Sequence, residues 1–267
     1  MRIFLFGHRG MLGHVAQRFL AEQGWEVVTS DLRYRGGPDD PLVEAAIEAD
    51  CDWYVNGLGR IKQKSTEQHE LMHTNVLFPL HLASRLSGSS KLIQPGTDCV
   101  FSGKEGFYPK DHPHNAEDVY GFSKSLAEKA LSGSPAIVIR TSIIGPELLD
   151  APKGLMGWFL KQEGGVNGFT NHIWNGITTL EWSRLCAEII RGEIGIPEQV
   201  VQPGSKSPVS KCELLKLISE TWDHECEVNP FEAPETIDRS LEPDVVRPDI
   251  QTQLKDFRDW YRSDPKS

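Results

Sequence analysis

The sequence predicts an α/β protein built on a doubly wound parallel sheet, with a smaller, irregular lobe toward the C-terminus. Three observations lead to this fold class: short apolar runs alternate with segments of helical periodicity, a glycine-rich turn joins the first run to the first helical segment, and the pattern loosens after Gly145. Near-continuous apolar strands are typical of a parallel sheet that is covered by helices on both faces.

The expected strands and helices alternate along the first half of the chain. The five apolar runs are residues 2–6, 25–30, 53–56, 91–96 and 136–142. Between them, helices are expected over residues 11–23, 41–49, 66–87 and 118–131. Apolar residues recur at helical spacing in the first of these helices, which Gly24 ends, and Asp118 is a suitable N-cap for the last.

The second half of the chain is expected to form a less regular lobe laid over the carboxyl edge of the sheet. Pro, Gly and Trp are frequent between residues 146 and 176. A helix is expected at 179–191, a short strand at 198–203 and a further helix at 210–221. The tail, residues 222–267, is Pro-rich and polar and ends in the amphipathic stretch LKDFRDWY.

Composition and charge exclude several classes of function. The chain of 267 residues carries a net charge of −10 and no basic block, which argues against nucleic acid as a partner because phosphate neutralisation needs clustered Lys and Arg. Its apolar start breaks at Gly7 and is too short for a signal sequence or a membrane span, so we expect a cytoplasmic protein with no membrane partner. The five cysteines lack metal-binding spacing, so free thiols and no metal are expected.

A glycine-rich turn follows the first strand and opens the first helix. Gly7, Gly10 and Gly13 form the pattern GxxGxxG. One glycine allows the tight turn, one lets the backbone approach a pyrophosphate, and one lets the helix pack on the strand. The helix N-terminus then offers N–H donors to phosphate oxygens. The turn therefore predicts a dinucleotide site.

The predicted domain division follows from these elements. The glycine turn and the five strands indicate a Rossmann-type dinucleotide-binding domain over residues 1–145. Elements near 177–206 are expected to return to this domain. Residues 146–267 are expected to form mainly the lobe that binds the substrate.

Two signals for the coenzyme conflict at the end of the second strand. Asp31 lies roughly 20 residues beyond the glycines, where an acid usually accepts a hydrogen bond from the adenosine ribose 2′-OH of NAD. Arg9 and Arg33 stand where guanidinium groups can hold the 2′-phosphate of NADP. The two converging cations favour NADP(H), and Asp31 keeps NAD(H) open.

Tyr120 and Lys124 stand four residues apart in the expected helix 118–131 and therefore share one helix face. A free tyrosine has a pKa of about 10, and a nearby ammonium is expected to lower that pKa by stabilising the phenolate. The pair can then deliver a proton to a developing alkoxide. Thr97, just past the fourth strand, can hydrogen-bond the same substrate oxygen, and Asp98 is the competing candidate.

Taken together, the motifs resemble those of the extended short-chain dehydrogenase/reductase superfamily. Within it, they resemble dTDP-4-dehydrorhamnose reductases and related sugar-nucleotide reductases. The matching stretches are GxxGxxG at 7–13, TDCVFSG at 97–103, VYGFSK at 119–124, RTSIIG at 140–145 and NGITTLEWSRLCAEII at 175–190. The turn GHRGMLG is also similar to that of GDP-fucose synthase, an NADPH-using relative, which supports the role given to Arg9.

The resemblance implies a role for each matching residue. Tyr120 is the acid, Lys124 its partner and a ribose ligand, and Thr97 the hydroxyl of the triad. Cofactor contacts are expected for Gly7, Arg9, Gly10, Met11, Leu12, Gly13, Asp31, Arg33, Asn56, Gly57, Leu58, Gly59, Asn75, Tyr120 and Lys124. Substrate contacts are expected for Asp98, Cys99, Val100, Arg140, Thr141, Ser142, Asn171 and Trp174. Cys99 replaces a tyrosine of the family pattern and Ser102 an aspartate, which leaves the identity of the sugar open.

The resemblance implies an enzyme, an NAD(P)H-dependent reductase of a nucleotide-linked 4-keto-6-deoxy sugar in deoxysugar or surface polysaccharide biosynthesis. Its expected partner is the nucleotide-sugar substrate, and a homodimer is compatible with the sequence. An NAD-dependent sugar-nucleotide epimerase or dehydratase on the same fold is one alternative. A non-catalytic, NADP-binding regulatory subunit is the other.

Overall fold

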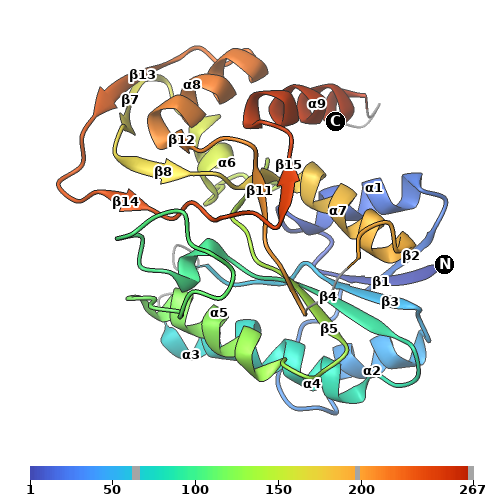
Figure 1. Ribbon diagram of the computed structural model, residues 1–267. Coiled ribbons are helices and arrows are strands. Elements are labelled where there is room, and N and C mark those ends of the chain that lie inside the picture. The colour runs from blue at the N-terminus through green and yellow to red at the C-terminus, as the bar shows by residue number, and fades with distance from the viewer. Residues whose placement is uncertain (62–66, 196–198, 264–267) are drawn as a thin grey trace.

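The centre of the molecule is a parallel sheet of six strands in the order β10-β5-β4-β3-β1-β2 (Figure 1). The computed structural model describes residues 1–61, 67–195 and 199–263. The strands are β1 (Arg2–Phe6), β2 (Glu26–Thr29), β3 (Trp53–Asn56), β4 (Lys91–Pro95), β5 (Ala136–Ile139) and β10 (Val200–Val201). The five expected strands are confirmed, and β10 from the second half of the chain adds the edge beside β5.

Helices cover both faces of this sheet, which confirms the doubly wound fold class (Figure 1). The helices on one face are α1 (Gly13–Glu22) and α7 (Thr179–Arg191), and those on the other are α2 (Pro41–Glu48), α4 (Phe78–Arg85) and α5 (Val119–Ala130). Successive side chains of β1 point to opposite faces. Ile3 and Leu5 therefore pack in one apolar core with α1 and α7, whereas Phe4 and Phe6 pack in the other with α2 and α4.

The long helix expected over 66–87 is divided. It consists of α3 (Gln68–Met72), a single π-helical turn (His73–Leu77) and α4. Single π turns inside helices are frequent at functional sites, and this one carries Asn75. Residue 66 of the expected helix, residue 198 of the expected strand 198–203 and residues 264–267 of the expected tail lie outside the described residues.

The helix that carries the Tyr120–Lys124 pair begins as expected. Asp118 is its N-cap, and the carboxylate accepts a hydrogen bond of 2.7 Å from the backbone N–H of Gly121. Between β4 and this helix the chain forms a short 3-10 helix (Asp98–Val100). Thr97 caps that 3-10 helix, which places its hydroxyl at the carboxyl edge of the sheet.

The rest of the second half forms a lobe of short strands and helices around its own apolar core (Figure 1). Its helices are α6 (Leu155–Phe159), α8 (Lys211–Trp222) and α9 (Ile250–Arg262). Its strand pairs include β7 (Gly164–Phe169) with β13 (Cys226–Phe231), β8 (His172–Trp174) with β12 (Val209–Ser210) and β14 (Ile237–Asp238), β6 (Ile143–Ile144) with β9 (Ile177–Thr178), and β11 (Pro203–Ser205) with β15 (Val245–Arg247). The proposed division of the chain into two domains stays a prediction.

Further features bear on the expected classes of function. Cys51, Cys99, Cys186, Cys212 and Cys226 are all free thiols. Within the described ranges, His, Cys, Asp and Glu side chains form no group of three or more that could hold a metal ion. In that same part of the chain, no helix is both long enough and apolar enough to span a membrane.

Candidate active site

The glycine turn brings the first helix close to the first strand. Gly7 has a φ of +69°, a conformation that favours glycine, and its carbonyl oxygen accepts a hydrogen bond of 2.8 Å from the N–H of Gly10. A Cβ atom added to Gly13 would lie 2.1 Å from that same oxygen. The backbone contact at Gly13 therefore leaves no room for a side chain, and the N-terminus of α1 opens toward the carboxyl edge of the sheet.

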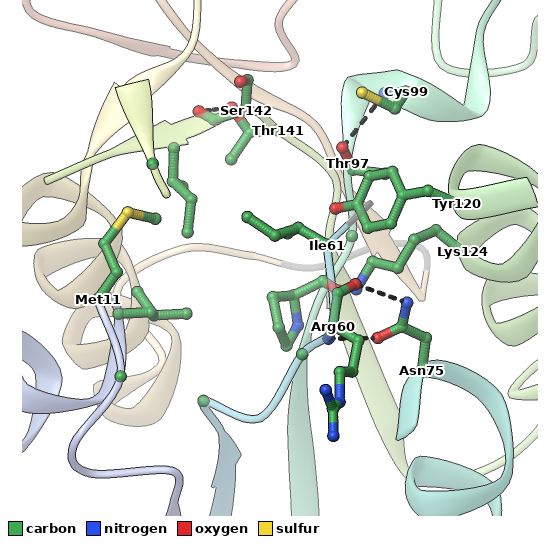
Figure 2. A pocket seen from close by; sticks show the side chains of 18 of the residues that line it. Met11, Arg60, Ile61, Asn75, Thr97, Cys99, Tyr120, Lys124, Thr141 and Ser142 are labelled. Atoms are coloured by element: carbon green, nitrogen blue, oxygen red, sulfur yellow. Dashed lines mark hydrogen bonds between the residues drawn. The ribbon is translucent and has the colours of Figure 1, made fainter. Parts of the chain in front are cut away.

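A cavity of about 340 Å³ lies at this edge (Figure 2). Its walls come from the glycine turn, from the segments that follow β3, β4 and β5, and from α5. The expected site residues that line it are Gly10, Met11, Leu12, Gly57, Leu58, Gly59, Asn75, Thr97, Asp98, Cys99, Tyr120, Lys124, Thr141 and Ser142. This position follows from parallel pairing, because the carboxyl ends of all the strands meet at one edge.

Thr97, Tyr120 and Lys124 point into the same part of the cavity, opposite Met11 and Ser142 (Figure 2). The Lys124 Nζ donates a hydrogen bond of 2.6 Å to the carbonyl oxygen of Pro95, at the end of β4. The Thr97 hydroxyl accepts a hydrogen bond of 3.2 Å from the N–H of Cys99. The backbone after β4 therefore positions both the ammonium and the hydroxyl beside the Tyr120 phenol.

The pKa of Tyr120 is raised above its usual value, whereas the sequence predicts a lowered one. Burial of the phenol is the largest cause, and the nearby Cys99 and Asp98 act in the same direction, while a hydrogen bond with Thr97 acts against them. Burial also lowers the pKa of Lys124 to about 8, although the Glu128 carboxylate acts against this change. Tyr120 is therefore a neutral phenol, the form that can donate a proton.

Asn75 fixes the segment that follows β3. Its amide oxygen accepts a hydrogen bond of 2.9 Å from the N–H of Arg60, and its amide nitrogen donates one of 3.0 Å to the Arg60 carbonyl oxygen (Figure 2). The same amide nitrogen donates to the Ser123 hydroxyl, 3.2 Å away on α5. Asn75 thus joins the wall formed by residues 57–61 to the helix that carries Tyr120 and Lys124.

A second cavity of about 290 Å³ adjoins the glycine turn and the end of β2. Gly7, Arg9, Asp31 and Arg33 line it, as the coenzyme signals in the sequence predict. The Arg9 guanidinium lies 2.8 Å from the Asp31 carboxylate, and His8 Nε2 lies 3.3 Å from the same oxygen. The acid expected to favour NAD and the arginines expected to favour NADP therefore line the same cavity.

Arg140 and Val100 do not face the cavity, which corrects their expected substrate contacts. Arg140 is buried, and its guanidinium donates to the Glu128 carboxylate and to Gln202 Oε1, the latter at 2.9 Å. Val100 is fully buried in the same apolar cluster as Phe101. Both side chains hold the fold together behind the cavity wall.

Three more residues with expected contacts do not line the cavity. Asn171 Nδ2 donates a hydrogen bond of 2.8 Å to the Ala233 carbonyl oxygen, so it joins two segments of the lobe. Trp174 is buried in the core of the lobe. Asn56 Nδ2 donates a hydrogen bond of 2.8 Å to Gln94 Oε1, and Asn56 Oδ1 accepts one from the backbone N–H of Leu58. Asn56 therefore shapes the turn after β3.

The sequence did not single out the loop between β6 and α6, yet Glu147 and Lys153 line the cavity. The Glu147 carboxylate accepts hydrogen bonds of 2.7 Å from the N–H of Lys153 and 2.5 Å from the N–H of Gly154. This contact holds the loop across from Met11, which also approaches Gly154. The stretch PELLDAPKG has no periodicity that would have revealed it.

A further cation, Lys211, belongs to the lobe. Lys211, the first residue of α8, places its Nζ 5.0 Å from the centroid of the Trp174 ring. Burial lowers the pKa of Lys211 to about 8. Burial raises the pKa of Asp98, and the charges of Lys211 and Arg239 act against that rise. Two cations of the lobe, Lys211 and Arg239, therefore act on the buried Asp98.

The fold is shared with several solved enzymes. A dTDP-4-dehydrorhamnose reductase from Clostridium acetobutylicum is 18% identical, with a TM-score of 0.78 over 98% of this chain and 100% of that chain. The enzyme of that name from Bacillus anthracis, solved with NADP, is 16% identical, with a TM-score of 0.80 over 96% and 98%. A UDP-glucose 4-epimerase from Thermotoga maritima, solved with UDP-glucose, is 17% identical, with a TM-score of 0.75 over 98% and 99%. At these identities the likeness shows the fold alone.

Sequence comparison adds the family. No curated protein matches this chain. A family model described as the RmlD substrate binding domain matches residues 1–152, which include the glycine turn, Thr97, Tyr120 and Lys124. The match covers more than half of the 267 residues and confirms the resemblance that the motifs predicted. The chain belongs to the RmlD substrate binding domain family.

Proposed function

We propose that this protein is a reductase that uses NADP(H), or NAD(H), to reduce the C4 ketone of a nucleotide-linked 4-keto-6-deoxy sugar. One observation carries the proposal: Thr97, Tyr120 and Lys124 converge in a cavity whose opposite wall is the glycine turn. The names of the related enzymes support the substrate class, since two of them are dTDP-4-dehydrorhamnose reductases. Such an enzyme would act in deoxysugar or surface polysaccharide biosynthesis.

The residues present fit a dinucleotide coenzyme. The close approach of Gly13 to Gly7 leaves the N-terminus of α1 uncovered by side chains, and its N–H groups would hold the pyrophosphate. The cavity at Asp31, Arg9 and Arg33 would take the adenosine end. Lys124 and Tyr120 would face the nicotinamide ribose. A bound reduced nicotinamide supplies the hydride that reduces the carbonyl carbon.

The chain's own contribution is to bind the carbonyl oxygen and to protonate it. Tyr120 is placed to donate its phenolic proton to the oxygen as negative charge develops there. The Thr97 hydroxyl, beside Tyr120, is placed to hydrogen-bond the same oxygen. The Lys124 ammonium, held by the Pro95 carbonyl, stabilises the phenolate that remains. The Tyr120 donor is in place before the reaction and stabilises the developing charge without reorganisation, whereas the Thr97 hydroxyl would first leave Asp98 Oδ1, to which it donates at 3.1 Å.

The test is the loss of reduced-nicotinamide absorbance when an enzymatically prepared dTDP-4-keto-6-deoxy sugar is added, with NADPH and NADH compared in parallel. We expect oxidation by the wild type and a fall in kcat of about 10²–10⁴-fold for Tyr120→Phe, the size typical of a lost acid. Tyr54→Phe is the matched control, because the Tyr54 hydroxyl bonds the Ala46 carbonyl in the core away from the cavity. Near-normal turnover by Tyr120→Phe would overturn the proposed mechanism.

A second candidate function is an NAD-dependent epimerase or dehydratase. The observation that favours it is the Asp31 carboxylate at the cavity beside the glycine turn, where an acid binds the ribose 2′-OH of NAD. An enzyme that returns the hydride to its own substrate retains its coenzyme. Non-exchanging NAD in the purified protein, together with no net coenzyme oxidation, would identify this function instead.

We also propose a cytoplasmic enzyme that binds its nucleotide-sugar substrate and no nucleic acid. The net charge of −10, without a basic block, supports the absence of a nucleic-acid partner. A homodimer is the oligomeric state that we would test first, by light scattering on the purified chain with and without coenzyme.

A further inference from the structure

We propose that Glu128 is a positioning residue that keeps Lys124 positively charged in its buried place beside Tyr120. The proposal rests on the proposed function, because it concerns the cation that serves the Tyr120 proton donor. Glu128 does not line the cavity, so its effect must pass through Lys124.

The first argument is the geometry of α5. Tyr120, Lys124 and Glu128 follow one another at intervals of four residues, and residues spaced in this way lie on one face of a helix. Tyr120 and Lys124 project into the cavity (Figure 2), whereas Glu128 lies one turn further along α5 and does not line it. The carboxylate is thus the anion that follows the Lys124 ammonium along the same helix face.

The second argument is the environment of the ammonium. Lys124 is only 7% exposed, and its Nζ donates to the Pro95 carbonyl, which carries a partial charge and no full one. A buried ammonium without a compensating anion shifts its pKa and loses its proton. Among the residues that the structure describes, the charges that act on Lys124 are those of Glu128 on α5 and Cys99 after β4, and both favour the protonated form. Cys99 is itself a poor anion, because burial raises the pKa of its thiol to about 12.

The third argument is that Glu128 is held as a permanent anion. Arg140, at the end of β5, donates from Nε to Glu128 Oε2 at 3.1 Å and from Nη2 to Oε1. His114 Nε2 lies 3.3 Å from Oε1. Burial acts to raise the pKa of Glu128, but the hydrogen bonds from His114 and Arg140 outweigh it and hold that pKa at about 2.

Arg140 is in turn fixed by its own contacts. Its Nη1 donates hydrogen bonds of 2.8 Å to the Lys110 carbonyl oxygen and of 2.9 Å to Gln202 Oε1. Arg140 therefore holds the carboxylate in place, and the effect of Glu128 on Lys124 is electrostatic. Of the Glu128–Arg140 pair, Glu128 is the member whose charge acts on Lys124.

The experiment is an NMR titration of the Lys124 ¹³Cε resonance, assigned by its loss in Lys124→Met, in the full chain without substrate. We expect a midpoint near pH 8 for the wild type and a downward shift of roughly one unit in Glu128→Gln, the size produced by losing a nearby charge. Glu128→Asp keeps the charge and should restore most of the wild-type midpoint. Glu44→Gln, which removes a carboxylate paired with Arg85 elsewhere, should leave the midpoint unchanged.

A second variant covers the case in which Glu128→Gln fails to fold because Arg140 is left buried and unpaired. Glu128→Gln combined with Arg140→Met removes both charges and should show the same downward shift of Lys124. In the active enzyme, the alkaline limb of kcat/KM should shift together with the NMR midpoint. An unchanged Lys124 midpoint in a folded Glu128 variant would overturn the proposal, and it would do so whatever the substrate proves to be.

Discussion

The Arg9 guanidinium and the Asp31 carboxylate form an ion pair of 2.8 Å across the cavity beside the glycine turn. The Arg9 side chain is 75% exposed and the Asp31 side chain 67%, and exposed ion pairs contribute little to stability. Either member can therefore exchange its partner for a ligand. An arginine that would bind a 2′-phosphate and an acid that would bind a 2′-OH neutralise each other, so the coenzyme must compete with this pair.

This competition predicts opposite effects of two substitutions on coenzyme choice. Asp31→Asn frees Arg9, so it should tighten NADPH and weaken NADH. Arg9→Gln should weaken NADPH by roughly tenfold or more, since hydrogen bonds to charged groups contribute about 1.5–3 kcal/mol. Quenching of protein fluorescence by each coenzyme gives the Kd values, and Arg35→Gln is the control because Arg35 does not line this cavity. Equal losses for both coenzymes in Arg9→Gln would show that Arg9 acts only through the shape of the turn.

The contact between Gly13 and Gly7 predicts a sharp penalty for a single methyl group. In Gly13→Ala the new Cβ would lie 2.1 Å from the Gly7 carbonyl oxygen, so the turn must open. We expect a loss of coenzyme affinity and a destabilisation of about 1–3 kcal/mol, the range for an overpacked contact. Gly195→Ala is the matched control, because nothing lies within 4 Å of a Cβ there. Thermal unfolding and coenzyme titration measure the two effects, and equal behaviour of the two variants would contradict this account.

The sequence was sufficient for the five strands of the first half of the chain and for the edge of the sheet where the cavity lies, but not for the short strands of the lobe or the division of the helix expected over 66–87. The strands and helices of that half follow from local periodicity. Asp118 is predictable as the N-cap of α5 because a side-chain oxygen just before a helix accepts a hydrogen bond from a free backbone N–H of the first turn. Thr97, Tyr120 and Lys124 meet because parallel strands place their carboxyl ends at one edge. Local pattern and topology are enough for predictions of this kind.

Predictions that depended on tertiary packing were less successful. In the sequence, a polar residue after a strand looks the same whether its side chain faces a substrate or a buried carboxylate. The sequence therefore predicts a substrate contact for Arg140, whose side chain pairs with Glu128 in the structure. Trp174 looked like a pocket residue and lies in the core of the lobe. The pKa of Tyr120 is raised, against expectation, because burial of the phenol is the largest cause and burial depends on the whole fold. The Glu147 loop carries no periodic signal at all.

The hydrogen bonds of Asn75 predict a role in coenzyme binding without a direct catalytic one. Asn75→Asp removes the N–H donor to the Arg60 carbonyl and places a carboxylate against that oxygen, so the segment 57–61 should loosen. We expect weaker coenzyme binding, by about tenfold, since an unsatisfied buried group costs about 1–3 kcal/mol. Asn229→Asp is the control, since its side chain approaches Gly165 in the lobe. A Kd identical to that of the wild type would contradict this role for Asn75.

The low pKa of Glu128 predicts how the fold responds to acid. That pKa is about 2 in the folded protein, against an ordinary value of 4.5. The Glu128 carboxyl group therefore loses its proton more easily in the folded protein than in the unfolded chain. Its stabilising contribution is complete above pH 4.5 and is lost as the pH falls toward 2.

We expect urea unfolding at neutral pH to show that the free energy of unfolding of Glu128→Gln is roughly 3 kcal/mol below that of the wild type, the size of a broken buried ion pair. The gap should narrow steadily below pH 4.5, whereas Glu44→Gln, which breaks a more exposed pair, should follow the wild type closely. Parallel curves for the wild type and Glu128→Gln down to pH 3 would show that the Arg140 and His114 contacts do not stabilise the ionised carboxylate.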